Sequence, residues 1–428
     1  MMESLQILHG DTLVGALVYD RKKDAVSLAY EASWQFGADG FPVSLSLPLE
    51  RKVHSDERVR PFLQGLLPDN PAMIEAWAKR FQISPRNPFD VIRNVGEDCA
   101  GALQFVRPER LERILSGELD SLILLSEDDL EKRMVDLHSQ ARSIPALTEG
   151  RFSLAGAQTK DALFLKDGRW HVPTGRIPST HILKPELEEF DHHALNEHFC
   201  LLLASRAGLI RAESSLLNIA GKRVLCVKRY DRFRDEDGTI RRVHQEDTCQ
   251  AFGRYPNQKY QADGGPSAAE IVGILRQYSD HPLDDIARFV MALAFNWVIA
   301  GTDAHAKNYS LLHGAGSCLR LAPLYDLASY LPYQRDAKST KVKLAMKIGS
   351  TYRLHEIDSA QWKKWAKEAG LTEAEVVSWV EVTIERVRAS LKSTRAAVAE
   401  TNDSRFLQTL ANAIEERADK LGGSWSNG

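Results

Sequence analysis

The chain has 428 residues, of which 43% are hydrophobic and 26% charged, and its formal net charge is −3. This is the composition of a globular protein that is long enough for two or three folding units. A slightly acidic chain has no overall attraction to nucleic acid, so tight autonomous DNA binding is not expected. Any anion site must come from local lysines and arginines.

The cysteines and the N-terminus bear on the cellular compartment. The five cysteines lie far apart, are odd in number and form no CxxC pair. We therefore expect reduced, mostly buried thiols rather than a disulfide framework or structural zinc. The first residues, MMESLQILHG, lack the basic and apolar regions of a signal peptide, and no apolar run is long enough for a membrane span. The sequence predicts a cytoplasmic protein without a membrane partner.

Residues 1–107 predict a small N-terminal α+β subdomain. Strand-like runs such as LVGALVY are broken by turn signals, and PAMIEAWAKRF, at Pro71–Phe81, has the apolar spacing of a helix. After Leu111, charged and apolar residues alternate with helical spacing. We therefore expect residues 108–147 to form a helical connector.

Residues 148–256 predict a β-rich nucleotide-binding lobe. The short β-like runs ALFL, HILK and RVLCVKRY surround one helical pattern from His192 to Ala207, which Gly208 can end. Residues 257–428 predict a helical catalytic lobe, because the chain is mainly of helical periodicity after the loop-like QADGGPS at 261–267. The predicted fold class is α+β, with a β-rich lobe, an all-helical C-terminal lobe that carries the catalytic residues, and a cleft between the two.

The stretch GTDAHAKNYS, which follows the apolar run FVMALAFNWVIA, has a kinase-like spacing of polar residues. Asp303 and Asn308 reproduce the D-x-x-x-x-N pattern of a kinase catalytic loop, and PLYDLAS supplies Asp326 shortly afterwards. We expect Asp303 to orient and deprotonate a hydroxyl group. Asn308 and Asp326 would hold Mg²⁺ through hard oxygen ligands. Lys307 would neutralise charge on the transferred phosphoryl group.

Three upstream stretches are candidates for nucleotide binding. FSLAGAQTK, at Phe152–Lys160, is a small-residue turn whose backbone N–H groups can hold phosphate oxygens. HILKP places Lys184 at the end of a strand-like run, the position from which a kinase lysine reaches the phosphates. In VLCVKRYDR, the backbone of Lys228 and Tyr230 would bind adenine and Asp231 would reach the ribose. An edge strand with solvated charges explains this last stretch equally well.

Other interpretations of the polar residues compete with these. Glu197 would form a kinase-like ion pair with Lys184, but unpaired glutamates on surface helices are more common. His305 and His313 lack the spacing and the acidic ligand of a zinc hydrolase. Ser153 lacks the G-x-S-x-G elbow of a serine hydrolase. These two site types are therefore disfavoured.

Lysines gather in KSTKVKLAMKIG, at Lys338–Gly349. An alternating basic segment can attract a phosphorylated or acidic macromolecule, although a solvated strand face is the default interpretation. The helical stretches around KKWAK and RASLKSTRAA are basic enough for auxiliary contacts to a DNA backbone, but not for reading its sequence.

Together, the motifs make the chain resemble HipA-type serine/threonine kinases, the toxin halves of bacterial toxin–antitoxin pairs. SLAGAQTK, HILKP, VKRYDR, HQEDTCQAFG, GTDAHAKNYS and LYDLAS occur in that order, and VGEDCAGAL extends the likeness towards the N-terminus. The resemblance implies a two-lobed protein-kinase-like fold and an ATP- and Mg²⁺-dependent kinase. It implies a translation component, such as an aminoacyl-tRNA synthetase, as substrate. It also implies a small helix-turn-helix, HipB-like antitoxin as partner, with only indirect or weak contact to DNA.

Carried over motif by motif, the resemblance makes Asp303 the catalytic residue, Asn308 and Asp326 the metal ligands and Ser153 the autophosphorylation site. A phosphoryl dianion on Ser153 would repel ATP from the loop, so we expect this modification to be inhibitory. The ATP-binding residues that the resemblance implies are Ala155, Gly156, Ala157, Gln158, Thr159, Lys160, Lys184, Lys228, Arg229, Tyr230, Asp231, His305, Ala306, Lys307, Asn308, Tyr325 and Asp326.

The sequence departs from the better-known members of the family at two positions. Lys228 stands where they have Glu, which leaves a backbone contact intact, and Ala304 stands where they have Gly, which stiffens the loop. Two alternatives remain open. One is a small-molecule kinase that uses the same site. The other is a catalytically vestigial nucleotide-binding corepressor that acts with a DNA-binding antitoxin.

Overall fold

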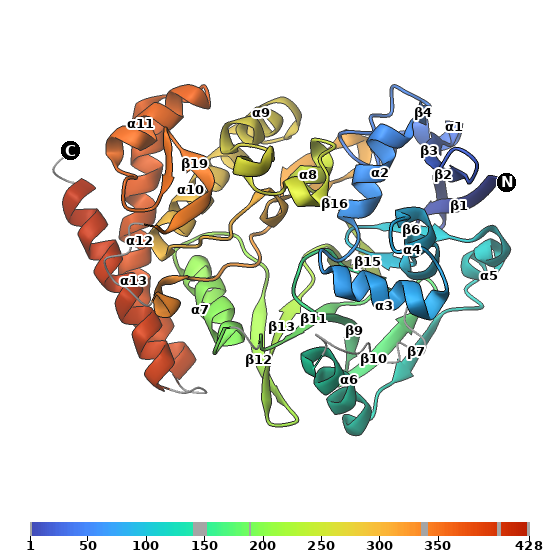
Figure 1. The fold of residues 1–428 in the computed structure, drawn as a ribbon, viewed down its shortest axis with the longest axis horizontal. Helices are drawn as coiled ribbons and strands as arrows, with labels where there is room; N and C mark the ends of the chain where they lie inside the picture. The colour runs from blue at the N-terminus through green and yellow to red at the C-terminus, as the bar shows by residue number, and fades with distance from the viewer. Residues whose placement is uncertain (1, 140–151, 188–189, 335–340, 400–403, 426–428) are drawn as a thin grey trace. The chain divides into compact units, whose positions relative to one another are not determined.

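The computed structural model describes residues 2–139, 152–187, 190–334, 341–399 and 404–425. Its contacts divide the chain into two compact units, each assembled from segments that are distant in the sequence (Figure 1). Unit 1 consists of Met1–Pro185, Leu217–Asn257 and Leu311–Leu319, and unit 2 of Glu186–Leu216, Gln258–Ser310 and Arg320–Gly428.

Unit 1 begins with a five-stranded antiparallel sheet in the order β4–β3–β2–β1–β6. Alternate strand residues such as Leu5, Leu17 and Leu28 are fully buried, and Phe62 and Phe89 from the helices pack into the same core. The elements are β1 (Met2–His9), β2 (Thr12–Asp20), β3 (Ala25–Tyr30), α1 (Ala32–Gln35), β4 (Val53–His54), α2 (Asp56–Gly65), α3 (Pro71–Phe81), α4 (Pro88–Val95), β5 (Asp98–Cys99), β6 (Leu103–Val106) and α5 (Leu111–Leu115).

A second sheet has six strands in the order β12–β13–β11–β9–β10–β7, and all of it belongs to unit 1 except the first three residues of β12. Met134 and Leu137 of α6 pack on its strands, in one core with Leu163 and Leu183. The remaining elements are β7 (Ser121–Leu124), α6 (Glu127–Ser139), β8 (Phe152–Ser153), β9 (Asp161–Lys166), β10 (Arg169–Thr174), β11 (His181–Pro185), β12 (Ser214–Ile219), β13 (Lys222–Lys228), β14 (Arg232–Arg234), β15 (Ile240–Arg242), β16 (His244–Asp247) and α8 (Thr248–Ala251).

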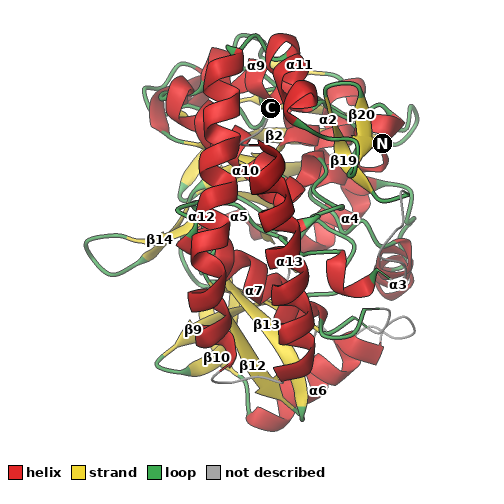
Figure 2. Ribbon diagram, turned by 90° about the vertical axis from the view of Figure 1, so that its left-hand side faces the viewer, coloured by secondary structure: helices red, strands yellow, loops and turns green. Residues whose placement is uncertain are grey.

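Unit 2 is mainly helical and is built around α10. Proline at its first position and two aspartates in its first turn favour the start of α10 there, and Phe289 and Trp297 are fully buried. α10 contacts α9, α12 and α13, and Figure 2 shows α10, α12 and α13 side by side. The elements are α7 (His193–Arg206), α9 (Ala268–Tyr278), α10 (Pro282–Ile299), β19 (Lys343–Ile348), β20 (Thr351–Arg353), α11 (Ser359–Glu368), α12 (Glu373–Ala399) and α13 (Ser404–Trp425).

Short strands and 3₁₀ turns complete the chain. Strands β17 and β18 continue from β16 in a three-stranded sheet, and the chain passes between the units within β17 and within β18. These elements are β17 (Ser310–His313), β18 (Leu319–Leu321) and the 3₁₀ turns η1 (Pro108–Arg110), η2 (Pro256–Gln258), η3 (Gln261–Asp263), η4 (Ala306–Asn308), η5 (Ala315–Ser317) and η6 (Leu331–Tyr333).

The predicted α+β fold class, with a β-rich N-terminal part and a helical C-terminal region, is confirmed. The C-terminal region also carries β17–β20, so it is not purely helical. The predicted helical connector contains β7, which pairs with β10. Helix α7, predicted with the β-rich lobe, belongs to unit 2 because it contacts α12 and α13. The four-part division into domains stays a prediction. Among the described residues, no helix combines the length and apolarity needed to cross a bilayer.

His198 on α7 makes the stability of unit 2 depend on pH. Its Nδ1 lies 3.0 Å from Ser214 Oγ, and burial, reinforced by the charge of Arg211, lowers its pKa to about 4. The ordinary value is 6.5. Between these two values the unfolded chain binds a proton that the folded chain does not. This contribution to stability is therefore complete above 6.5 and is lost as the pH falls towards 4.

We expect His198→Gln, which keeps a polar side chain near Ser214, to lose less stability than the wild type on acidification. Between pH 6.5 and pH 4.5 the free energy of unfolding of the wild type should fall by about 1–2 kcal/mol more than that of His198→Gln. Urea denaturation across this pH range measures it. His355→Gln replaces an exposed histidine and should behave like the wild type. An unchanged pH dependence in His198→Gln contradicts the assignment.

Candidate active site

The loop that carries Asp303 begins at a turn that ends α10. Ala300 has a left-handed backbone (φ 54°), and the N–H of Gly301 donates to the carbonyl of Asn296 at 2.7 Å. Gly301 is needed here because a Cβ would lie 2.3 Å from Asn296 Oδ1. The amide of Asn296 in turn donates to Tyr309 Oη at 3.2 Å. The buried C-terminal half of α10 therefore changes into a surface loop just before Asp303.

Asp303 is exposed, whereas Asn308, five residues later, is buried. The N–H of His305 donates to the carbonyl of Asp303 at 2.8 Å, and the N–H of Asn308 donates to that of His305 at 2.9 Å. The N–H of Ala306 donates to the carbonyl of Lys259 at 3.1 Å, which ties the loop to the segment before α9. The backbone is thus held while the carboxylate of Asp303 faces solvent.

Asp326 lies next to Asn308. Nδ2 of Asn308 donates to the carbonyl oxygen of Asp326 over a long 3.5 Å. Asp326 is exposed and has a φ of 57°, a conformation that is uncommon for a residue other than glycine. The hydroxyl of Tyr325 donates to the carbonyl of Lys307 at 2.6 Å and lies 2.6 Å from Ser310 Oγ. Tyr325 therefore fastens the Asp326 segment to the loop of Asp303.

His305 is influenced by charges from both segments. Burial lowers its pKa, the carboxylates of Asp303 and Asp326 act in the opposite direction, and Lys259 and Lys307 reinforce the lowering. His305 is therefore neutral near pH 7. Its Nδ1 is buried and has no hydrogen-bond partner in the part of the chain that the structure describes. The carboxylates of Asp303 and Asp326 thus influence the same imidazole, and their catalytic and metal-binding roles stay predictions.

Ser153 opens the predicted phosphate loop, which belongs to unit 1. Its strand β8 pairs in parallel with β5, its side chain is 0% exposed, and its Oγ donates to the carbonyl of Leu66 at 2.8 Å. Gly156 has a φ of 108°, and a Cβ there would lie 2.6 Å from Lys160 Nζ. That ammonium donates to the carbonyl of Ala155 at 2.6 Å. The loop is therefore closed over itself by its own lysine.

Lys184 lies on β11, between β9 and β13, opposite Leu225 and 8% exposed. Strand β13 ends at the exposed Lys228. Lys184 belongs to unit 1 and Glu197, on α7, to unit 2, so their predicted ion pair stays a prediction.

The charged side chains that follow β13, those of Arg229, Asp231 and Arg232, are buried in the protein interior. Arg229 donates twice to Asp231, at 3.0 and 2.8 Å, and Arg232 approaches both Asp231, at 3.0 Å, and Asp98, at 3.1 Å. Arg242 reaches Asp98 at 3.2 Å. Burial alone would raise the pKa of Asp231, but the guanidinium groups of Arg229 and Arg232 outweigh it and keep this pKa low. Three arginines and two aspartates thus form one buried ion network.

The predicted ribose contact of Asp231 is revised by this burial. Its side chain is 1% exposed, and Oδ2 also accepts from the N–H of Gly101 at 2.8 Å and from Gln245 at 3.1 Å. A ribose hydroxyl would have to displace bonds in the protein interior, so we assign Asp231 a structural role. Backbone contacts to adenine from Lys228 and Tyr230 do not need this carboxylate and stay predictions.

Tyr260 was missed by sequence reasoning. Its hydroxyl donates to Asp303 Oδ1 at 2.5 Å, and its ring lies edge-on against His305 with centroids 5.2 Å apart. Composition assigned the residues that follow it, QADGGPS, to a loop and gave Tyr260 no role. The two adjacent glycines of this loop were the available signal, because a Cβ on Gly265 would lie 2.2 Å from the carbonyl oxygen of Gln258. That close approach marks a tight turn that folds the segment back.

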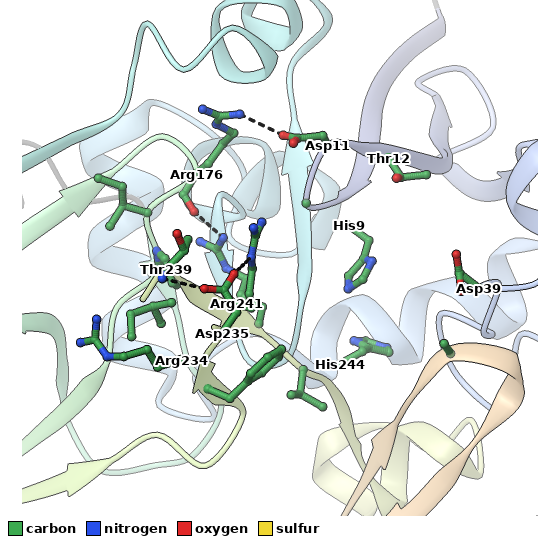
Figure 3. A pocket seen from close by; sticks show the side chains of 18 of the residues that line it. His9, Asp11, Thr12, Asp39, Arg176, Arg234, Asp235, Thr239, Arg241 and His244 are labelled. Carbon is green, nitrogen blue, oxygen red and sulfur yellow. Dashed lines mark hydrogen bonds and ion pairs between the residues drawn. The ribbon is translucent and has the colours of Figure 1, made fainter. Parts of the chain in front are cut away.

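A cavity of about 1400 Å³ lies within unit 1 (Figure 3). None of the predicted site residues lines it. Arg176 in its wall contacts Asp11 at 3.0 Å, and Arg241 contacts Asp235 at 2.7 Å. These two arginines are therefore paired with acidic side chains of the same wall.

The basic segment Lys338–Gly349 is described only in part, because Lys338 lies outside the described residues. Its strand β19 pairs antiparallel with β20 and places Lys343 opposite Arg353. Lys343 is exposed and Leu344 to Met346 are buried, which fits the solvated strand face.

Comparisons with known proteins agree with this architecture. Residues 5–106 match the model of the HipA N-terminal domain, and residues 152–391 match that of the HipA-like C-terminal domain. The chain is 36% identical over 412 residues to "Putative kinase Y4mE" of Sinorhizobium fredii, covering 95% of each. It is 29% identical over 385 residues to the serine/threonine-protein kinase toxin HipA of Shewanella oneidensis, covering 86% of this chain and 84% of the relative.

A solved structure shows the same fold. It is that of the Shewanella oneidensis HipA, HipB and operator DNA complex, and its match has a TM-score of 0.84 at 24% identity, covering 99% of this chain and 98% of the other. The protein is thus of the HipA-like toxin kinase class in fold and in domain content. The chain belongs to the HipA family, which confirms the resemblance found in its motifs.

The ion network generates a prediction that separates a structural from a nucleotide-binding role. Asp231→Asn leaves arginine charge in the interior without its counter-charge, and we expect the free energy of unfolding to fall by about 3 kcal/mol. Asp419→Asn is the matched control, since Asp419 pairs with Arg388 at 2.7 Å on the surface. It should change stability by less than about 1 kcal/mol. Wild-type stability in Asp231→Asn, with lost ATP affinity, would identify a nucleotide ligand instead.

Proposed function

We propose that this chain is an ATP-dependent serine/threonine protein kinase and the toxin of a toxin–antitoxin pair. The observation that carries the proposal is that Asn308 donates to the Asp326 carbonyl in unit 2, while the carboxylates of Asp303 and Asp326 both influence the pKa of His305. Phosphoryl transfer needs a carboxylate for the attacking hydroxyl and oxygen ligands for a metal ion that neutralises phosphate charge. These three residues supply both.

In the proposed reaction, the hydroxyl oxygen of a protein serine or threonine attacks the γ-phosphorus of ATP. Asp303 accepts the hydroxyl proton while the new O–P bond forms. The bond between the γ-phosphorus and the bridging oxygen breaks, and ADP leaves. The exposure of Asp303 suits an approaching protein side chain. Lys307 is proposed to neutralise the transferred group.

The residues present fit a Mg²⁺ ion. Because Asn308 uses Nδ2 to bind the Asp326 carbonyl, its Oδ1 is the atom left for a cation, and the Asp326 carboxylate is exposed. Mg²⁺ is commonly held by one or two protein oxygen ligands, with phosphates and water completing its shell. The bound ion would supply charge neutralisation for the triphosphate.

We assign the remaining nucleotide contacts as the family resemblance implies. The loop Ala155–Lys160 and Lys184 are proposed to hold phosphates, and the backbone of Lys228–Tyr230 to hold adenine. His305–Asn308 and Tyr325, which belong to unit 2, are proposed as further nucleotide contacts. The positive φ of Gly156 supports the loop assignment, since a glycine turn can bring backbone N–H groups to an anion.

Ser153 is the proposed autophosphorylation site. In the described arrangement its hydroxyl is buried against the carbonyl of Leu66, where a phosphoryl dianion would be both crowded and desolvated. Phosphorylation therefore requires β8 to leave its pairing with β5. The loop Ala155–Lys160 would then lose its support, which would switch the enzyme off.

The proposed protein substrate is a component of translation, such as an aminoacyl-tRNA synthetase. The proposed partner is a small helix-turn-helix antitoxin resembling HipB. Support comes from the Shewanella oneidensis relative, which is named a toxin and was solved with HipB and operator DNA. The net charge of −3 fits contact with DNA through such a partner.

The alternative of a catalytically vestigial corepressor is not favoured. Asp303 contributes no buried contact that the fold needs, and its exposed carboxylate on a loop held by backbone hydrogen bonds supports a catalytic role instead. No observation favours a small-molecule substrate over a protein.

We expect the purified wild type to label itself with radioactive ATP at Ser153. Asp303→Ala should reduce the labelling rate by about 10²–10⁴-fold, the range typical for loss of a general base. Phosphopeptide mapping locates the label, and Ser153→Ala should lose it at that position. Circular dichroism checks that each variant folds. Label that persists in Asp303→Ala would refute the assignment.

A further inference from the structure

We propose that Tyr260 is a positioning residue that sets the orientation of the Asp303 carboxylate. The inference rests on the proposed kinase function and adds a residue to its site. The Tyr260 hydroxyl donates to Oδ1 of Asp303 at 2.5 Å. Within the described ranges of the chain, this is the carboxylate's one hydrogen bond.

An exposed carboxylate needs such a restraint. The bond from the His305 N–H to the Asp303 carbonyl, at 2.8 Å, fixes the backbone but leaves the side-chain torsions free. A hydrogen bond from a fixed phenol selects one orientation of the carboxylate. Because it occupies Oδ1, it leaves Oδ2 of Asp303 to accept the proton of the substrate hydroxyl.

Tyr260 is itself held against the catalytic loop. Its ring lies edge-on to the buried His305, at an interplanar angle of 85° and a centroid distance of 5.2 Å. Its neighbour Lys259 accepts a hydrogen bond from the N–H of Ala306 at 3.1 Å. The phenol and the loop that carries Asp303 therefore belong to one packed arrangement.

The other side of the tyrosine is fixed by the turn η3. The carbonyl of Tyr260 accepts from the N–H groups of Asp263, at 2.9 Å, and Gly265, at 3.0 Å. Oε1 of Gln261 accepts from the N–H of Lys347 on β19 at 2.8 Å. Because the residues on both sides of Tyr260 are held by hydrogen bonds, its hydroxyl has a defined position next to Asp303.

This arrangement has a specific kinetic consequence. A base that is oriented by a third group loses efficiency when that group is removed, although the base itself remains. Asp303 is proposed to touch the attacking hydroxyl and not the nucleotide. Loss of its orientation should therefore lower kcat and leave the KM for ATP unchanged.

Tyr260→Phe tests this because it keeps the ring against His305 and removes only the hydroxyl. For a hydrogen bond to a charged group we expect kcat to fall about 10- to 100-fold with the KM for ATP unchanged. Tyr352→Phe is the matched control in unit 2, since its hydroxyl makes no hydrogen bond to the described residues, and it should behave as the wild type. A kcat within twofold of wild type, or a loss matched by a rise in KM, would overturn the proposal.

A second measurement does not depend on activity. In the full chain labelled with ¹³Cζ-tyrosine, the Tyr260 resonance is identified by its absence in Tyr260→Phe. We expect it to shift in Asp303→Ala and to stay in place in Asp419→Asn. A resonance that does not move contradicts the contact and the proposal. If it moves while the wild type transfers no phosphate, the kinase function fails and the positioning role with it, although the contact stands.

Discussion

The last turns of α10 are buried on nearly all sides, so the helix must end before the chain can present Asp303 to solvent. Two residues bring it to an end. The left-handed Ala300 and the glycine at 301 close α10 onto Asn296, whose side chain leaves no room for a Cβ at 301. Asp303 follows two positions later. The loop therefore starts from a rigid, fully packed base, and the hydrogen bonds of Asn308 and Tyr325 carry that rigidity to Asp326.

The site in unit 2 concentrates opposing charges around one neutral imidazole. Two exposed carboxylates, Asp303 and Asp326, and two ammonium groups, Lys259 and Lys307, all act on His305. Such a mixture suits a triphosphate with its counter-ion, because the carboxylates can face metal and hydroxyl while the lysines face phosphate. The same arrangement would contribute little to a purely structural interface.

In unit 1, a different balance of charge supports the predicted phosphate loop. Buried ions are costly unless they are paired. The buried ion network pairs them: Asp98, in the motif VGEDCAGAL, contacts arginines in and after the distant motif VKRYDR. Asp98 lies on β5, and β5 is the strand on which β8 pairs. Charges that resemble nucleotide ligands in the sequence thus hold the strand that opens the loop.

Sequence reasoning recovered what local patterns encode. The helix at Pro71–Phe81 has the predicted bounds, since apolar spacing and caps are local properties. The D-x-x-x-x-N spacing likewise falls on a loop, with Asp303 exposed and Asn308 buried, and the roles of these two residues stay predictions. β7 was missed because four residues carry too little pattern, and its pairing with β10 joins segments about fifty residues apart. The contact of Tyr260 with Asp303, across 43 positions, leaves no periodic signal at all.

Asn308 and Asp326 are proposed to form one metal-binding edge beside Asp303. The most direct measurement is a crystal structure of the chain with a non-hydrolysable ATP analogue and Mn²⁺, whose anomalous scattering locates the ion. We expect a Mn²⁺ peak in direct contact with Oδ1 of Asn308 and a carboxylate oxygen of Asp326, with the γ-phosphate facing Asp303. A nucleotide whose metal ion lies out of reach of both side chains would contradict it.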